Sequence, residues 1–155
     1  MKGKTKINTK VMQDYTKVVN VQDKAGKQHE LTLNIWDAAG EENVHNLAHL
    51  FLSGAQVGVL CYAIDDKRSY DQLTEWAEHL QDKAEDEIFI VLVGSKCDLS
   101  EHRAVPGHYG KRLMKTIKNC QFAMETSAFE NIETIQELFD TISKHIIDGG
   151  FYYQK

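Results

Sequence analysis

Two long apolar runs constrain the fold of this chain more than any other feature of the sequence. Residues 57–64 and 88–94 are almost continuously hydrophobic and lack the polar alternation of a strand with one face in water. Such runs are typical of strands buried on both faces of a parallel sheet, because helices then cover each side. We therefore expect two core strands, each buried on both faces.

The segments around these runs predict the covering helices. Apolar residues recur at helical spacing over residues 70–80 and again over 132–146, which indicates amphipathic helices that pack on a sheet. Pro106, the only proline, is predicted to start a further helix that continues to Ile117, and residues 121–124 are predicted to form a last short strand. The alternation indicates an α/β doubly wound sheet with helices on both faces.

A β-hairpin is expected before the first apolar run. Residues 18–22 and 29–35 alternate in polarity on either side of residues 23–27, a polar segment that contains glycine. This pattern is typical of two antiparallel strands joined by a short turn. The odd-numbered apolar residues of the second strand should share one face, and Trp36 should lie on the other.

Length and composition restrict the class of protein. A chain of 155 residues with 42% hydrophobic residues is expected to form one domain over residues 1–148, with a C-terminal tail at 149–155. A net charge of -5 argues against nucleic acid as a main partner. Its three scattered cysteines do not form a disulfide framework, and no apolar stretch is long enough to cross a bilayer. We expect a cytoplasmic protein with no transmembrane segment.

Three short motifs follow predicted strands, near the carboxyl ends where α/β sheets place ligands. They are Trp36-Asp37-Ala38-Ala39-Gly40-Glu41, Ser95-Lys96-Cys97-Asp98 and Glu125-Thr126-Ser127-Ala128. In their order and separation, the motifs resemble those of the Ras-superfamily small GTPases, and the Rab branch most closely, over roughly Tyr15 to Ile147. The resemblance implies a P-loop NTPase-like fold that binds GTP or GDP with Mg²⁺.

The second and third motifs imply recognition of guanine. The Asp98 carboxylate is expected to accept from N1–H and from the 2-amino group of guanine, and adenine does not offer this pair of donors. The resemblance places Lys96 along the base plane and a backbone N–H of Ser127-Ala128 on the guanine oxygen. Ser95 replaces the asparagine usual in the family, whose side chain ties neighbouring loops, so we expect a looser pocket.

The first motif bears on the phosphates and on catalysis. The resemblance gives Asp37 a water-mediated contact to Mg²⁺ and gives the Gly40 N–H a contact to the γ-phosphate. Glu41 stands where the family has the glutamine that orients the attacking water. A carboxylate about 4 Å from a phosphate charge costs about 4 kcal/mol at an effective dielectric constant of about 20. We therefore assign no catalytic residue and expect poor hydrolysis.

These 155 residues contain no Gly-x-x-x-x-Gly-Lys-Ser/Thr loop before the three motifs. In P-loop proteins that loop surrounds the phosphates with backbone N–H groups and completes the Mg²⁺ site, so binding of GTP or GDP with Mg²⁺ is expected to be weak or absent. The family places the strand leading into it between residues 29–36 and 57–64. We expect a fragment or shortened isoform, a second protein covering the gap, or a rearranged sheet, with residues 4–12 as an edge strand or extended loop.

Aromatic residues predict a protein partner. Trp36 and Phe51 match two positions of the aromatic triad through which Rab proteins bind effectors, and Tyr15 matches the third across a longer hairpin. Together they are expected to form an exposed patch for another protein; the alternative is that they are partly buried core residues. The chain has no cysteine after Cys120, so we expect no lipid anchor.

Two main functions follow from these observations. The first is a Rab-like homologue with impaired or absent GTP binding and hydrolysis, which acts as a protein-interaction or scaffold subunit within a larger intracellular assembly. The second is a fragment or isoform of a functional GTP-binding small GTPase that hydrolyses GTP to GDP in membrane traffic or signalling. An unrelated, nucleotide-free α/β scaffold is the third possibility.

Overall fold

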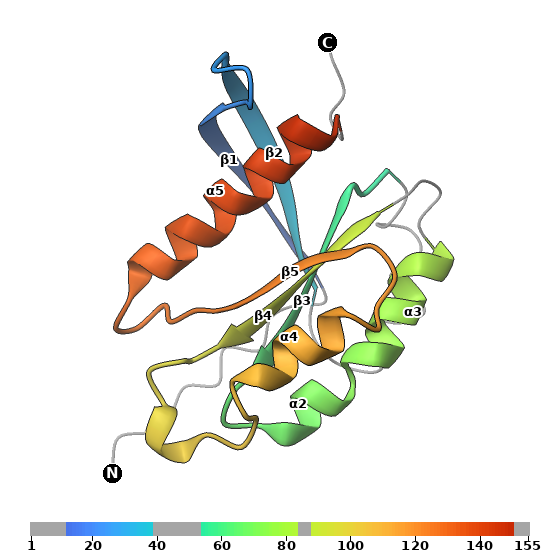
Figure 1. The fold of residues 1–155 in the computed structure, drawn as a ribbon, viewed down its shortest axis with the longest axis vertical. Helices are drawn as coiled ribbons and strands as arrows, with labels where there is room; N and C mark the ends of the chain where they lie inside the picture. The colour runs from blue at the N-terminus through green and yellow to red at the C-terminus, as the bar shows by residue number, and fades with distance from the viewer. Residues whose placement is uncertain (1–11, 39–53, 84–87, 151–155) are drawn as a thin grey trace.

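The computed structural model describes residues 12–38, 54–83 and 88–150 of the chain (Figure 1). The described strands are β1 Met12–Gln22, β2 Gln28–Ala38, β3 Val57–Ala63, β4 Phe89–Ser95 and β5 Cys120–Glu125. The described helices are α2 Lys67–Asp71, α3 Leu73–Lys83, the 3-10 helix η2 Ser100–His102, α4 His108–Met114 and α5 Ile132–Gly149. The alternation confirms the predicted α/β class.

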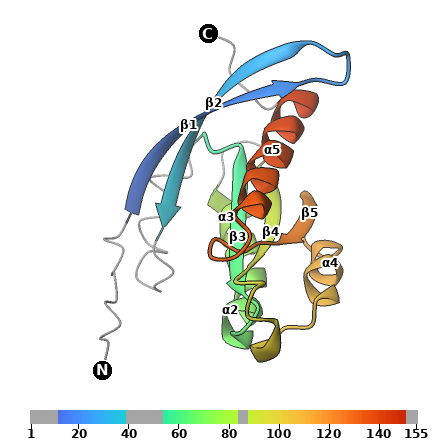
Figure 2. The ribbon, with the colours of Figure 1, turned by 90° about the vertical axis from the view of Figure 1, so that its left-hand side faces the viewer.

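The strands form two separate sheets. β3, β4 and β5 make a parallel sheet in that order, and β1 and β2 make a two-stranded antiparallel ribbon. Between the described residues of β2 and β3 no ladder of hydrogen bonds is formed. The ribbon lies beside α5 (Figures 1 and 2). Leu31 and Leu33 pack against the cluster beneath that helix, and the Lys24 N–H donates to Asp148 Oδ1 at 3.2 Å.

The ribbon confirms the predicted hairpin and explains its turn. Gln22 pairs with Gln28 at the last step of the ladder, and Gly26 adopts a φ of 85°, a left-handed conformation that glycine accepts without strain. The Asp23 carboxylate accepts from the N–H groups of Ala25 and Lys27, each at 2.9 Å. It also pairs with the His29 ring at 2.8 Å, and this contact is the main cause of the lowered pKa of Asp23.

Helices cover both faces of the parallel sheet, as predicted for a doubly wound fold (Figure 2). On one face, α5 contributes Leu138, Ile142 and Ile146 to a cluster with Phe89, Val91 and Val93 of β4. On the other, α2, α3 and α4 cover a cluster of Leu60, Tyr62, Ile64, Leu73, Ala77, Ile90, Leu92, Val105 and Ile117, with Tyr70, Trp76 and Leu113 packed against it. The ribbon joins the α5 side through Leu31 and Leu33.

The prediction that both apolar runs are buried on two faces is right for β4 and wrong for β3. Every residue from Phe89 to Val93 is at most 3% exposed. In β3, by contrast, Val59 is 43% exposed and Cys61 is exposed. The cluster under α5 takes residues from β4 and β5 but only Val57 from β3, so the helix does not cover the rest of that strand.

The helix predicted over residues 70–80 is two helices. α2 ends at Asp71 and α3 begins at Leu73, with Gln72 as the C-cap of α2. The Asp66 side chain caps α2 by accepting from the Arg68 N–H at 2.9 Å, which satisfies a donor that the first helical turn leaves free. α3 buries Leu73 and Ala77 on the sheet, at 1% and 3% exposed, and Tyr70 of α2 packs against the same cluster.

The helix predicted from Pro106 to Ile117 is shorter at both ends. The N–H of Tyr109 donates to the Pro106 carbonyl oxygen, and α4 proper begins at His108, with Gly107 as its N-cap, and ends at Met114. The strand predicted at 4–12 falls outside the described residues except for Met12, the first residue of β1.

Candidate functional site

The first loop of the candidate site leaves the carboxyl end of β4. Lys96 has a φ of 61°, a conformation that is uncommon for residues other than glycine, and its carbonyl oxygen accepts from the Leu99 N–H at 2.9 Å. These features bend the chain sharply after the strand. The Ser95 hydroxyl donates to the Tyr62 carbonyl oxygen at 2.9 Å, so the residue in the family's asparagine position binds β4 to the end of β3.

The second loop leaves the carboxyl end of β5 and is joined to the first by two backbone hydrogen bonds. The Thr126 N–H donates to the Gly94 carbonyl oxygen at 2.8 Å, and the Cys97 N–H donates to the Thr126 carbonyl oxygen at 3.0 Å. These bonds continue the pairing of β4 and β5 beyond the end of the ladder. The two loops that contain the predicted guanine contacts therefore lie side by side (Figure 1).

Asp98 and Ser127 are in direct contact at the centre of this arrangement. The Ser127 hydroxyl donates to Asp98 Oδ1 at 2.5 Å and accepts from the N–H groups of Phe129 at 3.2 Å and Glu130 at 3.0 Å. Ser127 is only 1% exposed, whereas Asp98 is partly exposed. A carboxylate has about four acceptor positions, so Asp98 retains acceptor capacity toward solvent.

The two backbone N–H groups predicted to contact guanine differ in availability. The Ser127 N–H donates to the Thr134 hydroxyl at 3.0 Å, and that hydroxyl in turn donates to the Asn131 carbonyl oxygen at 2.6 Å. Among the hydrogen bonds of the described part of the chain, none uses the N–H of Ala128. The structure therefore leaves the Ala128 N–H, rather than that of Ser127, free to bind a ligand.

An ion pair between Arg103 and Glu125 lies at the carboxyl end of β5. Arg103 binds Glu125 with two parallel hydrogen bonds, Nη1 to Oε1 at 2.7 Å and Nη2 to Oε2 at 2.8 Å, and its Nη1 also donates to the Val105 carbonyl oxygen at 3.1 Å. The hydrogen bonding of Arg103 to the Glu125 carboxylate is the main cause of the raised pKa of Arg103. Paired donors of this kind fix geometry as well as charge, so the pair orients the end of β5.

Lys96 extends across the site toward β3. Its Nζ lies 3.3 Å from Asp65 Oδ1, and the Lys96 residue is exposed. Its aliphatic stem thus lies at the surface beside the Asp98 loop. The predicted position of Lys96 along a base plane stays a prediction.

Asp37 lies apart from these residues, at the end of β2 in the other sheet. It is exposed and is paired in the ladder with Gln13. Gly40 and Glu41 of the same motif lie outside the described residues, so their predicted roles stay predictions.

The aromatic residues of the predicted partner patch do not share one face. Tyr15 is 52% exposed and Trp36 55% exposed. The register pairs Tyr15 with Ile35 and Trp36 with Asp14, and neighbouring positions of a strand alternate between faces, so the two aromatic side chains lie on opposite faces of the ribbon. Phe51 lies outside the described residues.

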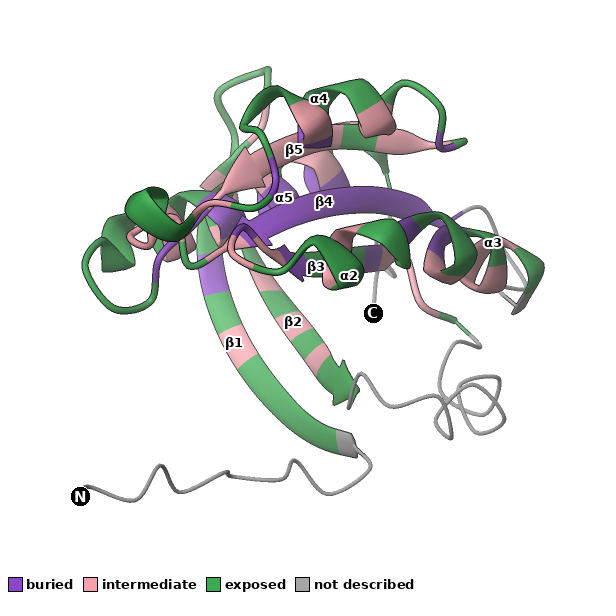
Figure 3. Ribbon diagram, turned by 90° about the horizontal axis from the view of Figure 1, so that it is seen from below, coloured by how far each residue is buried: buried purple, intermediate pink, exposed green. Residues whose placement is uncertain are grey.

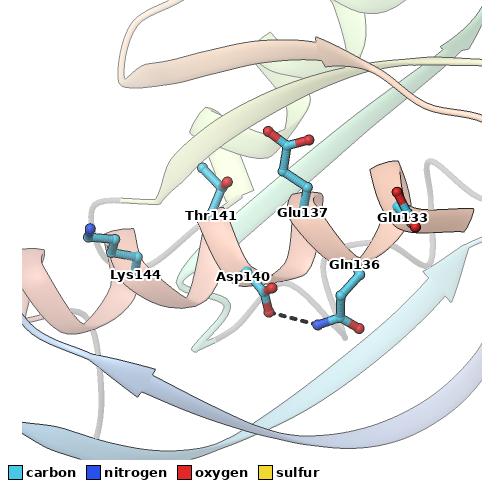
Figure 4. A pocket seen from close by; sticks show the side chains of 6 residues that line it. All are labelled: Glu133, Gln136, Glu137, Asp140, Thr141 and Lys144. Atoms are coloured by element: carbon cyan, nitrogen blue, oxygen red, sulfur yellow. Dashed lines mark hydrogen bonds between the residues drawn. The ribbon is translucent and has the colours of Figure 1, made fainter.

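A separate shallow hollow runs along α5. It is lined by Glu133, Gln136, Glu137, Asp140, Thr141 and Lys144. All six belong to one helix face that points away from the sheet, and Gln136 donates to Asp140 at 2.7 Å within it (Figure 4). This is the solvated side of an amphipathic helix, and it contains none of the predicted site residues.

None of the described helices is long and apolar enough to span a membrane.

The fold and the joined loops are consistent with a small-GTPase fold. The sequence matches the Ras family over residues 3–148, and the chain belongs to that family. It is Rab-like: it is 35% identical over 134 residues to the Ras-related protein Rab-17 of Homo sapiens, covering 86% of this chain and 59% of that protein. It is 37% identical over 112 residues to the Ras-related protein Rab-31 of Rattus norvegicus, which covers 72% of this chain and 56% of that protein. It is 30% identical over 118 residues to the Ras-related protein RabQ of Dictyostelium discoideum, which covers 76% of this chain and 56% of that protein. The chain thus spans less than three fifths of the length of these relatives.

Sequence reasoning missed two residues of this site. Thr134 occupies the Ser127 N–H, and Phe129, at 88% exposed, is the most exposed large hydrophobic residue in the described part of the chain. An aromatic residue directly after Ser127-Ala128 in an otherwise polar loop is a visible signal for Phe129. Nothing in the sequence indicates which N–H Thr134 would bind.

Proposed function

We propose that the polypeptide of this sequence is a cytoplasmic, Rab-like protein that recognises guanine, handles the nucleotide phosphates poorly and acts by binding other proteins. The observation that supports it most is the joining of Asp98, Ser127 and Ala128 at the carboxyl ends of β4 and β5. Their chemistry suits a guanine base, and partly buried hydrogen bonds fix Asp98 and Ser127 in place.

The guanine edge fits these groups. Its N1–H and 2-amino group are adjacent donors, which suit the remaining acceptor positions of Asp98. Its O6 is an acceptor, which suits the free N–H of Ala128. Adenine has an acceptor at N1 and a donor at C6, so it would face the Asp98 carboxylate with a lone pair and leave charged and polar groups unpaired.

The phosphate side is the basis for proposing weak nucleotide handling. Of the residues assigned to phosphate or Mg²⁺, the described part of the chain contains Asp37, exposed on a different sheet from the guanine contacts. When nucleotide binds, we propose that Asp37 contributes one carboxylate ligand to its Mg²⁺, and that Glu41 keeps hydrolysis slow by repelling the γ-phosphate.

The partner-binding role is proposed for the ribbon. Trp36 and Tyr15 keep more than half of their surface in solvent, and tryptophan and tyrosine are enriched among residues that dominate protein interfaces. Because they lie on opposite faces, a partner that contacts both would have to enclose the end of the ribbon. We propose Trp36, with Phe51, as the main contact and Tyr15 as a peripheral one.

Titration calorimetry with guanosine, GMP, GDP and GTP, the last two with Mg²⁺, tests the proposal. We expect the four affinities to agree within about tenfold, which corresponds to about 1.4 kcal/mol, and Asp98→Ala to abolish all of them. Asp140→Asn, a carboxylate change on the solvated face of α5, is the matched control and should alter none. Nanomolar binding of GTP would contradict impaired phosphate handling, and absence of any guanosine binding would contradict guanine recognition.

A further inference from the structure

The exposure of Phe129 is large for its surroundings. The residue follows Ala128 in the loop between β5 and α5 and is 88% exposed, while Thr126 and Ser127 of the same loop are 2% and 1% exposed. Single exposed hydrophobic residues are common on protein surfaces, so exposure alone assigns no role. The position of Phe129 relative to Asp98 is what distinguishes it.

The backbone of Phe129 is fixed to the group that binds the base. Its N–H donates to the Ser127 hydroxyl at 3.2 Å, and the same hydroxyl donates to Asp98 Oδ1 at 2.5 Å. A single side-chain oxygen thus bridges the Phe129 backbone and the carboxylate. The Glu130 N–H, at 3.0 Å from that oxygen, fixes the chain on the other side of Phe129. The ring is therefore attached to an ordered backbone next to the guanine contacts, while the ring itself is free of the core.

The contacts proposed above hold only the edge of the base. Asp98 and the Ala128 N–H are hydrogen-bonding groups, and such groups act in the plane of a purine. Both flat faces of the base remain to be covered. Two side chains of the described site have exposed apolar surface beside this edge: the stem of Lys96 and the ring of Phe129. Aromatic rings are well suited to this contact, because every base presents a π face on which they stack.

We propose that Phe129 is a base-stacking residue: its ring covers one face of a guanine base whose edge is held by Asp98 and the Ala128 N–H. The inference rests on the proposed guanine recognition and extends it. A site that gains little from phosphates depends more on contact with the base faces, so Phe129 sets much of its affinity for guanine nucleosides. Selectivity for guanine over adenine remains with Asp98, because stacking tolerates any base.

The test uses guanosine, with no phosphate, and the full chain. Phe129→Ala should weaken guanosine binding by about 5- to 100-fold, the range that loss of one aromatic–base stack produces, and Phe129→Trp should restore or exceed wild-type affinity. Val18→Ala, which alters a side chain 55% exposed on the ribbon, is the control and should bind as wild type. In NMR spectra, the H8 resonance of bound guanosine should move upfield with wild-type protein and lose that ring-current shift with Phe129→Ala.

The outcomes separate this inference from the proposed function. If wild type binds guanosine and Asp98→Ala abolishes binding, but Phe129→Ala binds within twofold of wild type with an unchanged H8 shift, stacking is overturned and guanine recognition stands. If wild type does not bind guanosine, both fail. Thermal unfolding of Phe129→Ala should match wild type because the ring packs against nothing in the core, so a loss of binding cannot be ascribed to misfolding.

Discussion

β4 and β2 each end in a motif assigned to the nucleotide, yet the protein holds them differently. β4 is buried on both faces, and its end is joined to β5 by the Thr126–Gly94 and Cys97–Thr126 hydrogen bonds. β2 alternates between half-buried and exposed residues, and its last three, Trp36 to Ala38, are all exposed (Figure 3). Packing and hydrogen bonds therefore fix the backbone beneath the motif that follows β4, whereas the described end of β2 is exposed to solvent.

The largest expected effect tests the difference in packing directly. Leu92→Ala removes a fully buried side chain from β4 and should lower the free energy of unfolding by about 2–5 kcal/mol, through lost burial and the cavity left behind. Val18→Ala, on the exposed face of the ribbon, should change it by about 0.5 kcal/mol or less. Chemical denaturation measures both. Equal losses would mean that the ribbon contributes to the core as much as β4 does.

The next effect concerns pH and the hydroxyl of Tyr62. Burial is the main cause that raises the pKa of Tyr62 from 10.0 to about 12, so the native state keeps its proton when the unfolded chain has lost it. The contribution of Tyr62 to the free energy of unfolding is fully present below pH 10. It falls as the pH rises toward 12, by up to about 2.7 kcal/mol. Denaturation of wild type and Tyr62→Phe at several alkaline pH values checks this. The variant should lose less stability over that range, and parallel curves would contradict the assignment.

A smaller loss of stability is expected from a substitution at Gly94 of β4, which lies close to Tyr62 of β3 and Glu125 of β5. A Cβ at Gly94 would lie 2.8 Å from the Tyr62 hydroxyl and 3.1 Å from Glu125 Cγ, so Gly94→Ala should cost about 1–3 kcal/mol by overpacking and should weaken guanosine binding. Gly107→Ala is the control, because its nearest atoms would lie at 3.8 and 3.9 Å. A destabilised Gly107→Ala together with an unaffected Gly94→Ala would show that close packing at β4 is not the cause.

The smallest effect is expected on the ribbon. Trp36→Ala should lower the free energy of unfolding by about 1 kcal/mol or less, because the side chain is already 55% exposed and surface substitutions have small effects. Guanosine binding should not change. A loss of several kcal/mol in a denaturation experiment would assign Trp36 to the core and remove it from the proposed interface.

Much of the fold was predictable because its signals are local. Periodicity located the hairpin, the core strands and the helices, and the guanine contacts stand directly after strands. The exposed face of β3 was not predictable, since its apolar run matches that of β4 and only the position of α5 separates them. The free Ala128 N–H depends on Thr134, which α5 brings back to the loop. A contact of that kind is tertiary and has no signature in a short motif.

The central claim is that Asp98 and its neighbours form a guanine site, and exchanging the base edge tests it most directly. Affinities of guanosine, inosine and xanthosine should be measured for wild type and Asp98→Asn. Wild type should prefer guanosine to inosine, which lacks the 2-amino donor, by about tenfold or more, as expected for a hydrogen bond to a charged group. Asp98→Asn should prefer xanthosine, whose C2 oxygen accepts from the new amide. Equal affinities of wild type for all three nucleosides, or an unchanged order in the variant, would contradict the account.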